Sequence, residues 1–161
     1  MRYLKPNHKI IVNGKEYPLI FSLELIDELQ DMSKCPMNRI MLMLTESKRK
    51  KTIVQTILKL ITGEIIEENI ELYSIQLLNI YIDQLKYKDM PELKPTEEEP
   101  QYEFIDVEYW FYVGKTVLGY SEEEVWKKTI GALRTHQREH HKATGVIKED
   151  KVVNVDDAIP Y

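Results

Sequence analysis

The sequence has little cysteine and no long hydrophobic run. Its 161 residues include one cysteine, Cys35, which cannot form a disulfide within the chain and fits a reducing cytoplasm. No basic segment followed by an apolar run stands near the first residue, so we expect no signal peptide. The longest apolar run falls far short of the about 18 residues that a membrane span needs. We therefore expect a cytoplasmic protein that does not enter a membrane.

The sequence also lacks the common catalytic motifs. It contains no P-loop, no glycine-rich dinucleotide motif, no zincin motif and no paired cysteines. One cluster of possible metal ligands remains, because His136 and His140 are one helical turn apart. Arg138 and Lys142 would oppose a cation there, which favours a basic helix end over a metal site. The sequence therefore predicts a protein that is not an enzyme and uses no cofactor or metal.

The charge balance is acidic overall, with a net charge of −5. A chain that is 43% hydrophobic and 30% charged has the composition of a globular protein. The net charge disfavours nucleic acid as a partner. A small regulatory module that contacts nucleic acid stays open as the alternative, because local basic residues could supply a cationic face: Lys48 to Lys51, Lys127, Lys128, Arg134, Arg138 and Lys142.

The first residues indicate a β-hairpin followed by helices. Lys9 to Val12 and Lys15 to Phe21 are β-prone and flank Asn13-Gly14, the strongest signal for a type I′ turn. Four helices are predicted after it, and the last is the longest: 23–32, capped by Ser22, then 37–44, 52–62, ended by Gly63, and 67–86. We expect a mainly α fold in which the hairpin packs on a helical lobe.

Prolines divide the chain. Pro91, Pro95 and Pro100, with three glutamates between them, cannot continue a helix, and residues 88–101 are predicted to be a linker. It would separate an N-terminal lobe, residues 1–87, from a small helical C-terminal module, residues 102–145. Residues 146–161 form a tail whose valines could pair with the hairpin or stay disordered.

A helix predicted over residues 104–118 contains four aromatic residues in succession. Phe104, Val107, Phe111 and Leu118 fit one buried stripe, so Tyr109, Trp110 and Tyr112 must use other faces. Those faces would meet either the N-terminal lobe or a partner, and tyrosine and tryptophan are common in interface hot spots. We predict that five aromatic residues bind a partner: Tyr109, Trp110, Tyr112, Tyr120 and Trp126. Core packing is the alternative, and for Trp126 it is the preferred interpretation.

Gly119 is expected to stop this helix, and Ser121 opens the next. Ser121 and Glu124 have the spacing of a capping box, in which each side chain satisfies the backbone of the other residue. Glu122 and Glu123 add negative charge where the helix dipole favours it.

The segment Leu118 to Thr129 resembles the glycine–serine–acidic–tryptophan segment of tail assembly chaperones from long-tailed bacteriophages and prophages. The opening Asn13 to Leu19 and the closing Val155 to Tyr161 are also similar to segments of that family. The resemblance implies a chaperone, active in the host cytoplasm, that keeps the tape-measure protein soluble. It also implies that the C-terminal part recruits tail-tube subunits, and homo-oligomers stay open.

Overall fold

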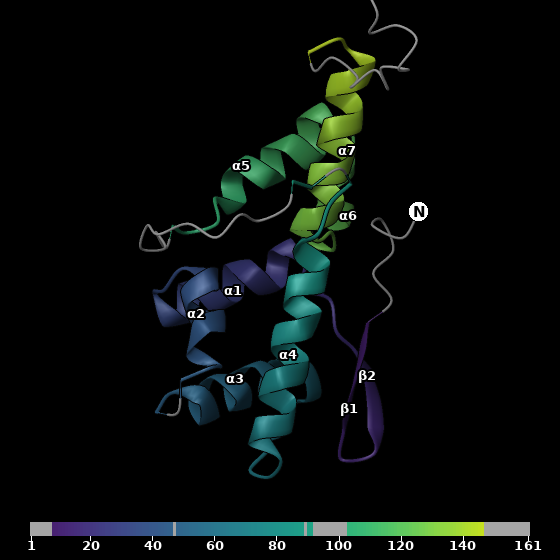
Figure 1. Ribbon diagram of the computed structural model, residues 1–161. Helices are drawn as coiled ribbons and strands as arrows, with labels where there is room; N and C mark the ends of the chain where they lie inside the picture. Colours follow the sequence, from purple (N-terminus) through teal and green to yellow (C-terminus); the bar gives the residue numbers. More distant parts are fainter. Residues whose placement is uncertain (1–7, 47, 89, 92–102, 147–161) are drawn as a thin grey trace, which may run out of the picture.

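The computed structural model describes residues 8–46, 48–88, 90–91 and 103–146. Within these residues the chain forms a two-stranded hairpin, seven α-helices and one π-helical segment (Figure 1). The predicted mainly α fold with an N-terminal hairpin is confirmed. Most of the predicted linker, residues 89 and 92–101, and residues 147–161 of the predicted tail lie outside the described part of the chain.

The hairpin consists of β1 (Lys9–Val12) and β2 (Lys15–Pro18), paired antiparallel with Val12 opposite Lys15. Asn13 and Gly14 have φ angles of 50° and 80°, which confirms the predicted type I′ turn. The second strand ends at Pro18, three residues before the expected Phe21. Ile10 and Val12 are buried, so the hairpin covers the helices beside it.

Four helices follow the hairpin: α1 (Leu23–Ser33), α2 (Met37–Met43), α3 (Lys50–Thr62) and α4 (Ile70–Leu85). The Ser22 hydroxyl caps α1 by accepting from the Leu25 N–H, and Gly63 ends α3 with a left-handed φ of 76°, both as predicted. The expected start of α4 at Glu67 is wrong. Asn69 adopts a left-handed φ of 58°, so the helix begins at Ile70.

The C-terminal helices are α5 (Val107–Tyr112), the π-helical segment η1 (Val113–Val117), α6 (Glu122–Trp126) and α7 (Ile130–Ala143). The predicted start at Phe104 is wrong, because Asp106 caps α5 by accepting from the Tyr109 N–H at 2.9 Å. Gly119 ends the preceding segment with a φ of 74°, as predicted. The capping box is confirmed, since Ser121 Oγ accepts from Glu124 N and Glu124 Oε2 accepts from Ser121 N.

α7 stands on the C-terminal end of α4 (Figure 1). Gly131 makes this approach possible, because a Cβ at this position would lie 2.4 Å from the Lys86 carbonyl oxygen. Thr135, one turn later, accepts a hydrogen bond from the Lys88 N–H at 3.2 Å. The glycine therefore sets how closely the two helices pack.

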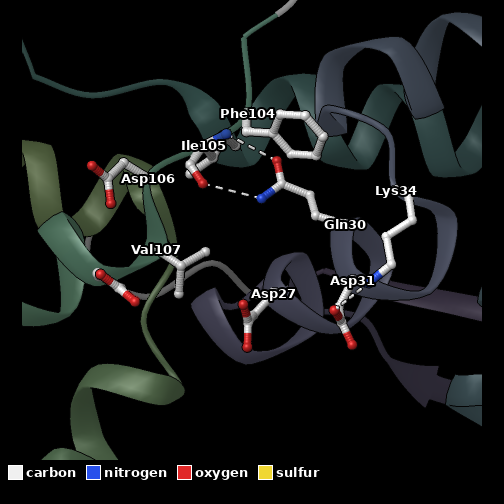
Figure 2. A pocket seen from close by; sticks show the side chains of 9 residues that line it. Asp27, Gln30, Asp31, Lys34, Phe104, Ile105, Asp106 and Val107 are labelled. Carbon is white, nitrogen blue, oxygen red and sulfur yellow. Dashed lines mark hydrogen bonds and ion pairs between the residues drawn. The ribbon is translucent and has the colours of Figure 1, made fainter.

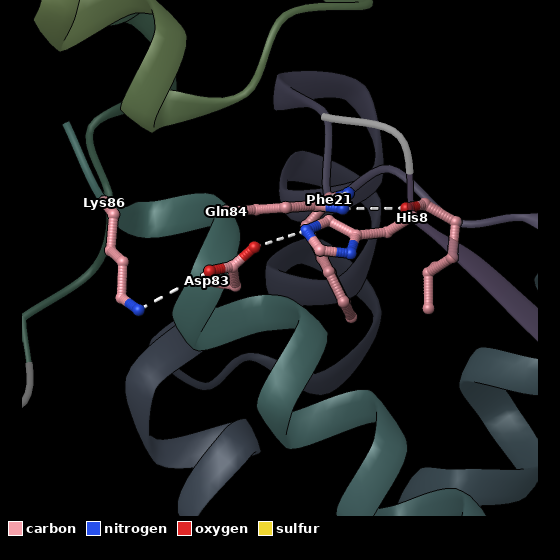
Figure 3. A network of polar contacts seen from close by, with 6 residues as sticks. His8, Phe21, Asp83, Gln84 and Lys86 are labelled. Carbon is pink, nitrogen blue, oxygen red and sulfur yellow. Dashed lines mark hydrogen bonds and ion pairs between the residues drawn. The ribbon is translucent and has the colours of Figure 1, made fainter. Parts of the chain in front are cut away.

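Side chains of α4 also hold the segment that joins the hairpin to α1 (Figure 3). The Gln84 amide accepts from the Phe21 N–H at 2.7 Å and donates to the Leu19 carbonyl at 2.8 Å. Asp83 lies between His8 and Lys86. Although burial acts to raise the pKa of Asp83, the hydrogen bonds and charges of His8 and Lys86 lower it.

A backbone bridge joins the start of α1 to the start of α7. Ser22 pairs with Thr129, and the Leu23 N–H donates to the Lys128 carbonyl at 2.9 Å. One hydrophobic cluster contains residues from both sides of the linker, including Ile26, Leu77, Trp110 and Leu133. The division into two lobes stays a prediction.

No helix in the described ranges is long and apolar enough to cross a membrane.

Candidate partner-binding surface on α5 and α7

Trp110 lies in the core, with 9% of its surface exposed. The predicted buried stripe of Phe104, Val107, Phe111 and Leu118 is wrong, because Phe104 precedes the helix and is 56% exposed, and the other three are only partly buried. Trp110 and Val113 face the core instead.

The π-helical segment explains part of this difference. The Leu118 N–H donates to the carbonyl of Val113, five residues back, so the turn holds one residue more than an α-helical turn. The face that continues from α5 into η1 is therefore not the one that a period of 3.6 residues predicts. Gly114 lies on the buried side, where a Cβ would lie 2.8 Å from a Val125 methyl group.

Tyr109 and Tyr112 lie at the surface, 47% and 57% exposed. With Phe104 they place three exposed aromatic side chains within nine residues of the chain. The Tyr109 ring meets the Trp110 ring edge-on, with the centroids 5.2 Å apart. Tyr109 and Tyr112 are the part of the predicted partner-binding set that α5 presents to solvent, and Phe104 lies just before the helix.

Tyr120 and Trp126 are half-buried and contact neighbouring helices. The Tyr120 hydroxyl is hydrogen-bonded to His136 Nδ1, and Lys128 lies over the Tyr120 ring at 4.8 Å from its centroid. The Trp126 ring packs on Phe111, with the centroids 5.0 Å apart, so it joins α6 to α5. Burial lowers the pKa of His136.

A basic pocket of about 290 Å³ lies where α7 faces α5 and the end of α4. α7 supplies residues spaced by three or four positions: Arg134, Gln137, Arg138 and His141. Tyr87, Tyr109 and Trp110 form the aromatic walls. We call this the basic pocket.

A more open groove of about 540 Å³ runs between α1 and the start of α5 (Figure 2). Its wall is fixed by the Gln30 amide, which donates to the Ile105 carbonyl and accepts from the Ile105 N–H. Four carboxylates and one lysine line it: Asp27, Asp31, Asp106, Glu108 and Lys34. The groove is therefore acidic, in contrast to the basic pocket farther along α5.

Exposed apolar side chains also occur on the N-terminal helices. Leu72, Ile75 and Ile82 form one stripe along α4, spaced by three and seven residues, and each is about half exposed. A smaller apolar groove of about 230 Å³ lies between α1, α2 and α3, where Met32 and Ile53 line it.

The described residues contain no group of three or more histidine, cysteine or acidic side chains placed to hold a metal ion. Of the pair noted in the sequence, His136 is engaged with Tyr120.

No family model matches the chain. No curated protein and no solved structure matches it either.

Sequence reasoning missed the two buried glutamines and the basic pocket. Gln30 and Gln84 each occupy a position in an otherwise apolar helical stripe, such as Tyr73, Leu77, Tyr81 and Gln84 on α4. A polar residue within such a stripe signals a buried hydrogen bond. The basic pocket gave no local signal, because its walls come from segments on both sides of the linker.

Proposed function

We propose that this protein is a non-enzymatic assembly chaperone that binds an apolar helical partner through the exposed aromatic face of α5. In this proposal the partner is the tape-measure protein of a long-tailed phage, prophage or phage-derived tail particle. The C-terminal module then recruits tail-tube subunits, in the host cytoplasm.

The observation that carries the proposal is the exposure of Phe104, Tyr109 and Tyr112 on one short segment. Large aromatic side chains cost free energy when they face water, and gathered on a surface they mark sites of protein contact. The apolar stripe on α4 adds a second surface that an amphipathic helix could cover. The resemblance of residues 118–129 to tail assembly chaperones names the partner.

Trp110 is not a suitable residue for testing this surface. Its side chain is buried, so truncation to alanine should destabilise the fold by about 3–5 kcal/mol, as for other core tryptophans. Tyr112 is the better choice, because it is exposed and no aromatic neighbour packs on its ring within the described residues.

The test is co-expression with fragments of the tape-measure protein encoded in the same genome. Tyr112→Ala should keep the melting temperature of the wild type yet weaken partner binding by about 2 kcal/mol, a usual hot-spot value, and let the fragments aggregate. Ile11→Ala, at an exposed apolar position on the hairpin, is the matched control and should solubilise them like the wild type. Equal solubilisation by Tyr112→Ala and the control would reject this face as the binding site.

Contact with nucleic acid is the second candidate, favoured by the basic pocket. Several of the basic residues expected on such a face are paired instead, since Lys50 bonds to Glu71 and Lys127 to Glu123, both at 2.7 Å. Binding of a nucleic acid would fall steeply with added salt, because counterions are released, whereas binding of an apolar helix would not.

A further inference from the structure

Arg134 has aromatic partners and, among the described residues, no anionic one. Its guanidinium lies over the Tyr87 ring, 5.5 Å from the centroid, and over the Trp110 ring at 5.6 Å. Within the described part of the chain it makes no hydrogen bond and no ion pair. The two rings orient the guanidinium, while its five N–H donors stay available to a ligand.

Tyr109 offers a further donor in the basic pocket. Its hydroxyl oxygen accepts a hydrogen bond from Gln137 Nε2 at 2.9 Å. Because the oxygen is used as an acceptor, the hydroxyl proton can be donated to a ligand in the pocket that Tyr109 lines. The amide of Gln137 thus fixes the position of a second polar group near Arg134.

The charge of the basic pocket selects an anion. Arg134 supplies a positive charge in it, and none of the described residues that line it carries a carboxylate. An arginine fork binds a carboxylate through two parallel hydrogen bonds, and these are stronger than bonds between neutral groups. A planar carboxylate beside aromatic walls fits this set of donors.

We propose that the basic pocket binds the carboxylate of a glutamate or aspartate side chain of a partner protein. Arg134 is the main ligand, and the Tyr109 hydroxyl is the second donor. This proposal rests on the proposed function in one respect: the carboxylate belongs to the helical partner that binds α5. It adds that this partner carries an acidic residue beside its apolar face.

The surroundings favour a protein over a nucleic acid. A polynucleotide binds along a continuous track of cationic groups. Here the acidic groove, with Asp27 and Glu108, lies at the other end of α5 and would repel a phosphate backbone. A compact cationic pocket next to exposed tyrosines matches one acidic side chain on an apolar helix.

The two tryptophans provide the measurement. Trp110 lines the basic pocket, whereas Trp126 packs on Phe111 and does not line it, so the indole N–H signals in an NMR spectrum give a probe and an internal reference. The probe is a blocked Ala-Glu-Ala peptide, with the Ala-Gln-Ala peptide as its matched control, both titrated into the full chain at constant ionic strength. A short thymidine oligonucleotide is titrated in parallel.

We expect the glutamate peptide to shift the Trp110 signal saturably and to leave the Trp126 signal in place. The glutamine peptide should bind the wild type about tenfold or more weakly than the glutamate peptide does. The glutamate peptide should also bind the Arg134→Gln variant about tenfold or more weakly than it binds the wild type. In each case a charge-assisted hydrogen bond is lost. Tyr109→Phe should weaken binding by about threefold or more. Lys127→Gln removes an exposed charge just after α6, outside the pocket, and should change nothing.

Three results would overturn the proposal: an unmoved Trp110 signal, equal binding of the two peptides, or tighter binding of the oligonucleotide than of the glutamate peptide. Arg134 is exposed, so melting temperature should show that Arg134→Gln is folded. If the wild type does not bind the glutamate peptide but still keeps tape-measure fragments soluble, the pocket proposal is rejected and the chaperone function is kept. Glutamate binding without solubilisation of those fragments rejects the chaperone function and keeps the pocket.

Discussion

Two buried glutamines join segments that are far apart in the sequence. The Gln30 oxygen accepts from the Met37 N–H and the Ile105 N–H, at 3.1 and 2.9 Å, and its amide donates to the Ile105 carbonyl. Gln84 makes the equivalent pair with Phe21 and Leu19. Each side chain satisfies backbone groups in loops or, for Met37, at the start of a helix, which is what burial of polar groups requires.

His136 makes stability depend on pH. Burial lowers its pKa in the folded protein below the ordinary 6.5, so the unfolded chain binds the proton more tightly. The stability that the neutral ring contributes is therefore present above pH 6.5 and is lost as the pH falls below it.

When the pH is lowered from about 7.5 to about 5.5, we expect the urea concentration at the unfolding midpoint of the wild type to decrease. The decrease should be smaller in His136→Gln. His140→Gln, one helical turn further along α7, is the control and should follow the wild type. The same dependence on pH in all three proteins would show that His136 is not its source.

At the scale of elements, the hairpin turn depends on Gly14. A Cβ at Gly14 would meet no atom within 4 Å, so any cost of substitution comes from its φ of 80° and not from crowding. Gly14→Val should lower the free energy of unfolding by about 1–3 kcal/mol, because a β-branched residue is strained at positive φ. Urea denaturation measures this change.

Glu16→Val is the control for this experiment. It places the same residue at an exposed strand position, where valine is favoured, and should be close to neutral. An unchanged midpoint for Gly14→Val would mean that the turn does not have the φ angles described.

Elements whose boundaries depend on local chemistry could be predicted from the sequence. The turn at Asn13-Gly14, the end of α3 at Gly63 and the capping box at Ser121 each rely on residues within four positions of one another. The π-helical segment was not predicted, because the sequence around it has no local signal, and its Gly114 packs against Val125 of another helix, α6. Tyr109 and Tyr112 lie at the surface as the sequence predicted, whereas Trp110 is buried.

At the scale of the whole molecule, the chain on either side of the linker contributes to one hydrophobic cluster. The linker prediction rests on the prolines and glutamates of residues 91–100. Glu-C protease should therefore cleave first after Glu97 or Glu98, since an accessible extended segment is cut before a helix. The two fragments should still elute together in size-exclusion chromatography, because Gly131, Gln30 and the backbone bridge hold the two parts in contact.

The same digest run in urea is the control, in which the fragments should separate. Separation of the fragments without denaturant would show that the two parts do not depend on each other. A first cut after Glu122, Glu123 or Glu124 would place the accessible segment in α6 instead of the linker.

The bridge between Ser22 and Thr129 has a consequence for synthesis on the ribosome. The N-terminal end of α1 leaves the ribosome early, but its partner at Lys128 and Thr129 is translated only after all of α2 to α6. A nascent chain that stops before Lys128 therefore leaves the Leu23 N–H without its acceptor. One that stops before Ile105 leaves the Gln30 amide with only its hydrogen bond from the Met37 N–H. Such long-range contacts slow folding and keep apolar surface exposed meanwhile. We expect shortened products of this chain to need help to stay in solution, even though the whole molecule is proposed to give that help to another protein.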